Sequence, residues 1–190
     1  MREQSAKEAR ILAAERETDH THTEIQGWLR DLGHSLGYDV WIAANDHSRP
    51  WQDGKLGDGC LSVLPGFTTE TQGAESVRLI DVLWLDRDSH RIVAAFEVEH
   101  STTIYSGIVR MLDLALGSEA QALEGLFLVA PDKREADVRE QLKRPAFSRI
   151  ADLKVRYLPY GALEKDRAAI ARFGHGLKPV QAISHALTPI

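Results

Sequence analysis

The sequence predicts an α/β domain in which a central mixed β-sheet is flanked by helices on both faces. Apolar runs of strand length alternate with segments whose apolar residues recur at helical spacing. In the middle of the chain, two strand-like runs flank a short turn-prone segment, which predicts an antiparallel hairpin. Residues 125–131 are almost entirely apolar, as is typical of a strand covered on both faces. A hairpin together with such a strand predicts a mixed sheet between two layers of helices.

Length and composition are those of one globular domain. The chain has 190 residues, of which 43% are hydrophobic and 27% charged, and its formal net charge is −5. A single cysteine and the lack of a leader-like start predict a cytoplasmic protein, and no apolar run is long enough to cross a membrane. We expect a helical arm at residues 1–18, one domain at 19–175 and a tail at 176–190.

The first part of the chain predicts two helices followed by a strand. Residues 3–17 are rich in Ala, Glu, Lys and Arg, which favours an exposed helix. Thr21 and Glu24 have the spacing of a capping box, and the apolar stripe that follows predicts a helix that ends at Gly37. Beyond it we expect a strand at residues 38–44, a loop at 45–59 and a short strand at 61–64.

The remaining elements follow the same patterns. The hairpin strands are predicted at residues 79–86 and 91–99. Helices and strands then alternate, with helices at 103–116, 132–144 and 160–173 and strands at 125–131 and 154–158.

Three carboxylates are predicted to share one face of the hairpin. Strand side chains alternate between faces, so Glu97 and Glu99 point the same way. If Asp86 pairs with Ile92, Asp81 lies directly opposite Glu97, and a register shifted by two residues places it opposite Glu99 instead. Facing like charges destabilise a sheet. The acids therefore either meet water on a solvated face or surround a hard divalent cation such as Mg²⁺.

This arrangement resembles the PD-(D/E)XK nuclease superfamily, which includes many restriction and repair nucleases. The resemblance rests on Asp81 in one hairpin strand and on Glu97-Val98-Glu99 at the end of the next, between a preceding and a following helix. It extends over roughly residues 21–158 as an order of elements. It implies a restriction endonuclease-like fold and a nuclease domain at residues 19–175.

The resemblance also implies a metal site and a reaction. Asp81, Glu97 and the backbone carbonyl of Val98 would bind Mg²⁺, with Mn²⁺ as a substitute, and a metal-activated water would hydrolyse a DNA phosphodiester. Glu99 stands where the family pattern has lysine, and Ile80 stands where it has proline. A glutamate there can act as the base or as a ligand of a second cation.

Five further residues are candidates for the site. Glu24 matches the acid that many members of the superfamily carry on the helix before the hairpin, although local capping explains it as well. His100, Ser101 and Thr102 can contact a phosphate at a helix N-terminus, or the two hydroxyls can simply cap that helix. Arg110 falls on the polar side of its helix and can reach DNA.

Basic residues gather in the last third of the chain. Residues 132–190 hold 12 Lys plus Arg and 7 Asp plus Glu, despite the acidic total. Lys133, Arg134, Lys143 and Arg144 can form a surface that binds the DNA backbone, and a solvated helix face is the simpler alternative. The net acidity, which at first disfavours nucleic acid, is thus compatible with an acidic site beside a basic region.

Other classes of site find less support. His20 and His22 form a close pair, but no third ligand stands at zinc-site spacing. Gly54, Gly57 and Gly59 match no phosphate-binding loop, so we expect no nucleotide cofactor.

We therefore expect a metal-dependent DNA endonuclease. Many members of the superfamily that it resembles cut two strands as dimers, and this chain has one candidate site, so the resemblance also implies a homodimer. The alternatives are a nucleic-acid-binding domain without catalysis, since the family lysine is absent, and a hydrolase that uses Asp81 and Glu97 without metal.

Overall fold

The computed structural model describes residues 21–68, 71–100, 104–117, 122–145, 147 and 153–187. The helical arm expected at residues 1–18 lies outside these ranges, as do Ser101 and Thr102. The first described element is a helix over residues 21–35, as the apolar pattern predicts.

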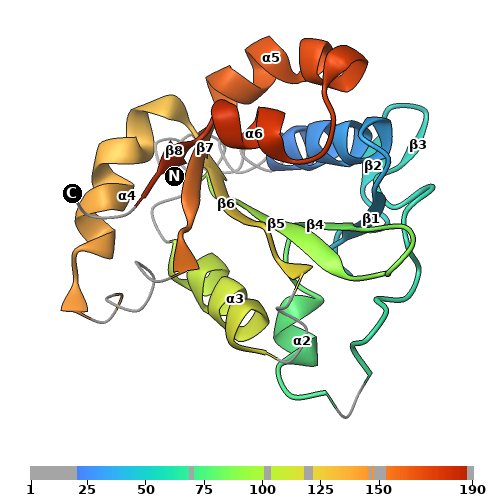
Figure 1. Ribbon diagram of the computed structural model, residues 1–190, viewed down its shortest axis with the longest axis horizontal. Helices are drawn as coiled ribbons and strands as arrows, with labels where there is room; N and C mark the ends of the chain where they lie inside the picture. Colours follow the sequence, from blue (N-terminus) through green and yellow to red (C-terminus); the bar gives the residue numbers. More distant parts are fainter. Residues whose placement is uncertain are drawn as a thin grey trace, which may run out of the picture.

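A six-stranded mixed sheet forms the centre of the molecule, which confirms the predicted fold class (Figure 1). The antiparallel neighbours are β1 with β4, β4 with β5, and β7 with β8, whereas β5, β6 and β7 run parallel. In spatial order the strands are β1 (Asp39–Ile42), β4 (Val82–Leu85), β5 (Ile92–Val98), β6 (Gly125–Ala130), β7 (Arg156–Pro159) and β8 (His185–Ala186).

The hairpin of β4 and β5 has the register that places Asp81 opposite Glu97. Val82 pairs with Phe96, so the next position along the ladder joins Asp81 to Glu97. The end of the hairpin nearest the turn differs from the expectation, because Ile92 pairs with Leu85 instead of Asp86. A register shift between Trp84 and Leu85 absorbs the extra residue, as a β-bulge does.

Helices cover both faces of the sheet. On one face lie the 21–35 helix, α5 (Tyr160–Phe173) and α6 (Lys178–Ala182), and on the other lie α2 (Ala74–Val77) and α3 (Tyr105–Leu116) (Figure 1). A short 3₁₀ turn, η2 (Asp132–Arg134), leads into α4 (Glu135–Leu142), whose Val138 packs with the α3 side. Successive side chains of each strand point to opposite faces of the sheet, so they contribute to two apolar clusters, one on each face.

Several segments differ from the predictions. Residues 61–64 form bends instead of a strand, and the 45–59 loop contains a small hairpin of β2 (Pro50–Trp51) and β3 (Gly54–Lys55). The segment expected to be a tail contributes α6 and β8, and β8 extends the sheet by pairing with β7. Within the described residues, no helix is both long enough and apolar enough to cross a membrane.

Candidate active site

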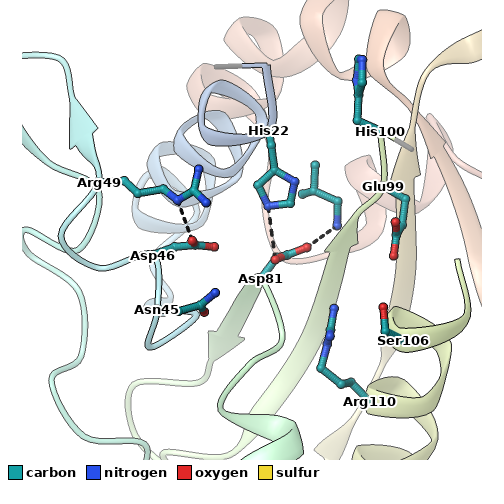
Figure 2. A pocket seen from close by; sticks show the side chains of 10 residues that line it. His22, Asn45, Asp46, Arg49, Asp81, Glu99, His100, Ser106 and Arg110 are labelled. Carbon is teal, nitrogen blue, oxygen red and sulfur yellow. Dashed lines mark hydrogen bonds and ion pairs between the residues drawn. The ribbon is translucent and has the colours of Figure 1, made fainter. Parts of the chain in front are cut away.

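A polar pocket of about 300 Å³ lies at the end of the sheet where β1 and β5 finish and β4 begins (Figure 2). The 21–35 helix borders it on one side and the first turn of α3 on the other. Its lining residues are His22, Asn45, Asp46, Arg49, Asp81, Val98, Glu99, His100, Ser106 and Arg110.

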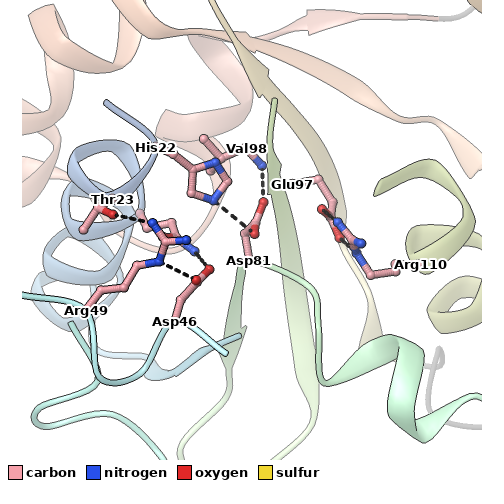
Figure 3. Close-up of polar contacts among 9 residues, drawn as sticks. His22, Thr23, Asp46, Arg49, Asp81, Glu97, Val98 and Arg110 are labelled. Carbon is pink, nitrogen blue, oxygen red and sulfur yellow. Dashed lines mark hydrogen bonds and ion pairs between the residues drawn. The ribbon is translucent and has the colours of Figure 1, made fainter. Parts of the chain in front are cut away.

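Asp81 is held between β5 and the 21–35 helix. It immediately precedes β4 and is buried. Its Oδ2 accepts a hydrogen bond of 2.7 Å from the backbone N–H of Val98, and its Oδ1 lies 3.3 Å from Nε2 of His22 (Figure 3). The N–H and C=O of one strand residue point to the same side, so the Val98 carbonyl also faces the Asp81 side of β5.

Glu97 is paired with Arg110 from α3. Arg110 donates from Nε to Oε1 at 2.8 Å and from Nη2 to Oε2 at 2.6 Å, which is a two-pronged contact (Figure 3). The Glu97 side chain is 0% exposed and that of Arg110 is 22% exposed. Burial raises the pKa of Glu97, and the hydrogen bonds from Arg110 oppose this effect. Glu97 is thus a buried charge whose counter-charge the protein supplies itself.

Glu99 faces the pocket from the end of β5. Burial, followed by the charge of Asp81, raises the pKa of Glu99 to about 7, while Arg110 acts in the opposite direction. Gly107 of α3 allows the helix to come close to both glutamates. A Cβ at position 107 would lie 2.9 Å from Oε1 of Glu99 and 3.1 Å from Oε2 of Glu97.

His22 and Asp46 join Asp81 in a cluster that the sequence patterns did not reveal. One ligand atom of each of the three residues lies within 4.8 Å of those of the other two. Asp46 is fixed by Gln26, whose Nε2 donates to its Oδ2 at 2.8 Å, and by Arg49, whose Nε donates to its Oδ1 at 2.7 Å. The sequence shows no third ligand at zinc-site spacing from His22, and Asp46 lies in the segment predicted to be a loop.

Burial alone would lower the pKa of His22. The hydrogen bond to Asp81 and the charges of Asp81 and Asp46 outweigh burial, so this pKa is raised. The neighbouring carboxylates therefore favour the protonated form of His22.

Glu24 lies apart from the cluster. Successive helix residues are separated by about 100° around the axis, so Glu24 is turned about 200° from both His22 and Gln26. It is half-buried and does not line the pocket. The helix thus offers His22 and Gln26 to this end of the sheet where an acid was expected.

Of the three residues predicted to contact a phosphate near the start of α3, the structure describes only His100. His100 lines the pocket, and its ring stacks on Tyr160 at a centroid distance of 6.1 Å. Ser101 and Thr102 are outside the described residues, and α3 begins at Tyr105 instead of residue 103. Ser106, in the first turn of α3, lines the pocket.

One residue of the predicted basic surface is buried in the structure. Arg134 is 9% exposed, so its placement on an exposed surface is wrong: the 3₁₀ turn after β6 buries it, and its charge partly opposes the rise in the pKa of Glu99. Lys133, Lys143 and Arg144 are exposed as expected. Lys143 pairs with Glu140 at 2.8 Å.

Arg144 lies next to the start of α3. It donates from Nη1 to the Tyr105 hydroxyl at 2.6 Å, and its guanidinium lies 5.7 Å from the centre of the Tyr105 ring. Tyr105 precedes Ser106, which lines the pocket, so Arg144 contacts the helix turn that borders the site.

Comparison with known proteins relates the chain to a restriction enzyme family. The family model described as the type II restriction enzyme NmeDI C-terminal domain matches residues 3–177. The type II restriction enzyme NmeDI of Neisseria meningitidis serogroup C is 32% identical over 152 residues, which cover 76% of this chain and 41% of that enzyme. The chain therefore spans about two fifths of the length of this relative. No solved structure matches the chain.

Proposed function

The chain belongs to the family of the type II restriction enzyme NmeDI C-terminal domain, and on this premise we propose that it is a metal-dependent DNA endonuclease. The observation that carries the proposal is the meeting of Asp81, Glu99 and the main chain of Val98 in one pocket. Arg49 and Arg110 line the same pocket, so cationic side chains stand beside the acids (Figure 2). Such a pocket combines groups that hold a cation with groups that attract phosphate.

Asp81, Glu97 and the Val98 carbonyl are the proposed ligands of the catalytic Mg²⁺, for which Mn²⁺ can substitute. All three offer oxygen atoms, which Mg²⁺ prefers. The buried carboxylates also fit a cation: burial and the charge of Asp81 raise the pKa of Glu99, and a cation bound between the acids would offset both effects. When bound, the ion would activate water and neutralise charge on the phosphate oxygens.

Glu97 can act as a metal ligand while it remains paired with Arg110. Each carboxylate oxygen has two lone pairs, so an oxygen that accepts a hydrogen bond from Arg110 can still face a cation. The two hydrogen bonds of 2.8 and 2.6 Å fix the plane of the carboxylate. Arg110 is therefore proposed as a positioning residue for Glu97 that also lies within the pocket.

Glu99 is the proposed general base. Its carboxylate faces the pocket beside Asp81, while Gly107 leaves room for it next to α3. From there it can accept the proton of the attacking water as the phosphodiester bond breaks.

DNA is the proposed substrate, and its backbone would be bound by charges around the pocket. Arg49, Arg110 and His100 lie at the pocket itself, and the exposed Arg144 lies next to the start of α3. Lys133 and Lys143 extend this cationic surface along η2 and α4. Contacts of this kind bind phosphate and do not read base sequence.

A plasmid-nicking assay tests the proposal. In Mg²⁺ we expect the full chain to convert supercoiled plasmid to nicked or linear DNA, and we expect EDTA to stop the reaction. Asp81→Asn should abolish cleavage because it removes the charge that the cation needs. Asp88→Asn is the matched control, since Asp88 is exposed in the turn at the other end of the hairpin. Equal cleavage by the Asp81→Asn variant and the wild type would refute the proposed site.

A second candidate function is DNA binding without cleavage. The Glu97–Arg110 ion pair favours it, because the protein itself neutralises the acid that would bind metal. A DNA-binding assay run beside the nicking assay separates the two functions: binding without nicking in both Mg²⁺ and Mn²⁺ would support the non-catalytic function.

A further inference from the structure

We propose that His22, Asp46 and Asp81 form a second cation site, which binds a divalent transition metal in preference to Mg²⁺. The site lies between the 21–35 helix, the segment after β1 and the residue before β4 (Figure 3). It shares Asp81 with the proposed catalytic centre and so rests on the same pocket, but metal binding there requires no DNA.

The geometry of the cluster suits a single ion. The ligand atoms of His22, Asp46 and Asp81 lie within 4.8 Å of one another, so one cation can reach all three after small side-chain movements. The two oxygens of Asp81 have different neighbours: Oδ1 lies beside His22, and Oδ2 accepts from the Val98 N–H. Oδ1 therefore serves the second site, on the helix side of Asp81.

The ligands are held in place by neighbouring residues. Gln26 and Arg49 each donate to a different oxygen of Asp46, and the Val98 N–H orients Asp81. Outer contacts of this kind fix metal ligands before the ion arrives.

Gln26 gives a second, independent indication of a ligand. The residue is 0% exposed, and its Oε1 has no hydrogen-bond partner among the described residues. Its amide orientation is fixed, because the acceptor Asp46 requires the NH₂ group. A buried carbonyl oxygen without a partner is costly, and a cation or a water bound to that cation would satisfy it. Gln26 is four residues after His22, so both lie on one face of the helix.

The donor set selects the class of metal. An imidazole nitrogen with carboxylate oxygens suits first-row transition metals, whereas Mg²⁺ prefers oxygen ligands alone. The proposed catalytic ligands of Asp81, Glu97 and Val98 are all oxygens. His22 therefore distinguishes the two sites chemically.

The test is a Mn²⁺ titration of the full chain without DNA, in which electron paramagnetic resonance measures free Mn²⁺ and competition measures Mg²⁺ binding. We expect His22→Asn to weaken Mn²⁺ binding by about 10-fold or more, to leave Mg²⁺ binding nearly unchanged, and to remove the ¹⁴N signal from bound Mn²⁺. His34→Asn, on the same helix but away from the pocket, is the matched control. Thermal unfolding of each variant without metal checks that the fold is intact.

A second variant, Arg49→Gln, should change the affinity for Mn²⁺ in the opposite direction. It removes a positive charge next to Asp46 and keeps a hydrogen-bond donor there, so Mn²⁺ should bind more tightly. Wild-type binding of Mg²⁺ as tight as that of Mn²⁺, or an unaltered ¹⁴N signal in His22→Asn, would overturn the inference. If the protein binds Mn²⁺ through His22 but does not cleave DNA, the proposed endonuclease function is wrong and the second cation site stands.

Discussion

Glu97 and Arg110 determine how charge is balanced inside the site. A fully buried carboxylate is strongly disfavoured unless a partner is close, and Arg110 approaches it with two short hydrogen bonds. The pair can be studied apart from catalysis, because its loss affects folding even when no metal is present.

Arg110→Met should destabilise the protein strongly in EDTA. The variant keeps much of the side-chain volume but leaves Glu97 buried without its partner, so we expect the free energy of unfolding to fall by about 3–5 kcal/mol. Urea denaturation measures this change. Adding Glu97→Gln to the same variant should restore part of the loss, since it removes the unpaired charge.

The control is Arg139→Met, which removes an i,i+4 ion pair with Glu135 at the surface of α4. A pair of this kind contributes about 0.2–1 kcal/mol. An equally small effect of Arg110→Met would contradict the view that Glu97 depends on Arg110.

At the level of residues, the sequence identified the acids but not their partners. Strand alternation placed Asp81 and Glu97 on one face because that rule is purely local. It could not show that the long Arg110 side chain turns back toward β5. The sequence also could not predict the cluster of His22 and Asp46, because these residues come from separate segments that meet only in the folded protein.

At the level of elements, close packing of the 21–35 helix on β4 positions His22. The Trp84 ring is fully buried, and its Nε1 donates to the Leu29 carbonyl of this helix at 3.1 Å. A Cβ at Gly33 would lie 2.5 Å from the same Nε1, so the helix can approach this closely only because residue 33 is glycine.

Gly33→Ala should therefore destabilise the protein even though alanine favours helices. Overpacking of this kind costs about 1–3 kcal/mol, because the buried Trp84 has little room to move. Chemical denaturation checks the change, with Ser35→Ala as an exposed control in the same helix that should stay within about 0.5 kcal/mol of the wild type. A stabilised Gly33→Ala variant would show that the helix does not pack as described.

Strongly patterned elements were predictable and short ones were not. The helix at 160–173 was expected at the bounds it has, and the buried β6 was evident from its apolar run. The strand expected at 61–64 was wrong because those residues bend away, with Leu64 packing in the core. β8 has only two residues, both exposed, so no periodic pattern could reveal it.

At the level of the whole molecule, we expect DNA binding because charge is distributed unevenly over the protein. The acids Asp81, Glu97 and Glu99 are gathered at one end of the sheet, whereas Lys133, Lys143 and Arg144 are exposed on or beside α4. The net charge of −5 therefore says little about the surface that DNA would meet.

Arg144→Gln should weaken DNA binding and make it less dependent on salt. If Arg144 contacts one phosphate, its loss should reduce the slope of log affinity against log salt concentration by about 0.9. Fluorescence anisotropy with labelled duplex DNA at several salt concentrations measures the slope. Lys165→Gln, an exposed position on α5, makes the same change in net charge and should leave the slope nearly unchanged. Equal slopes for the two variants would exclude a specific contact by Arg144.

The most direct test of the central claim is a crystal structure of the protein with Mn²⁺, using anomalous scattering to locate the ion. The claim is that Asp81 anchors a metal centre at the end of the β4–β5 hairpin. It predicts an anomalous peak within bonding distance of a carboxylate oxygen of Asp81. Ordered Mn²⁺ found only away from Asp81, with Glu97 still paired to Arg110 and the pocket free of metal, would contradict it.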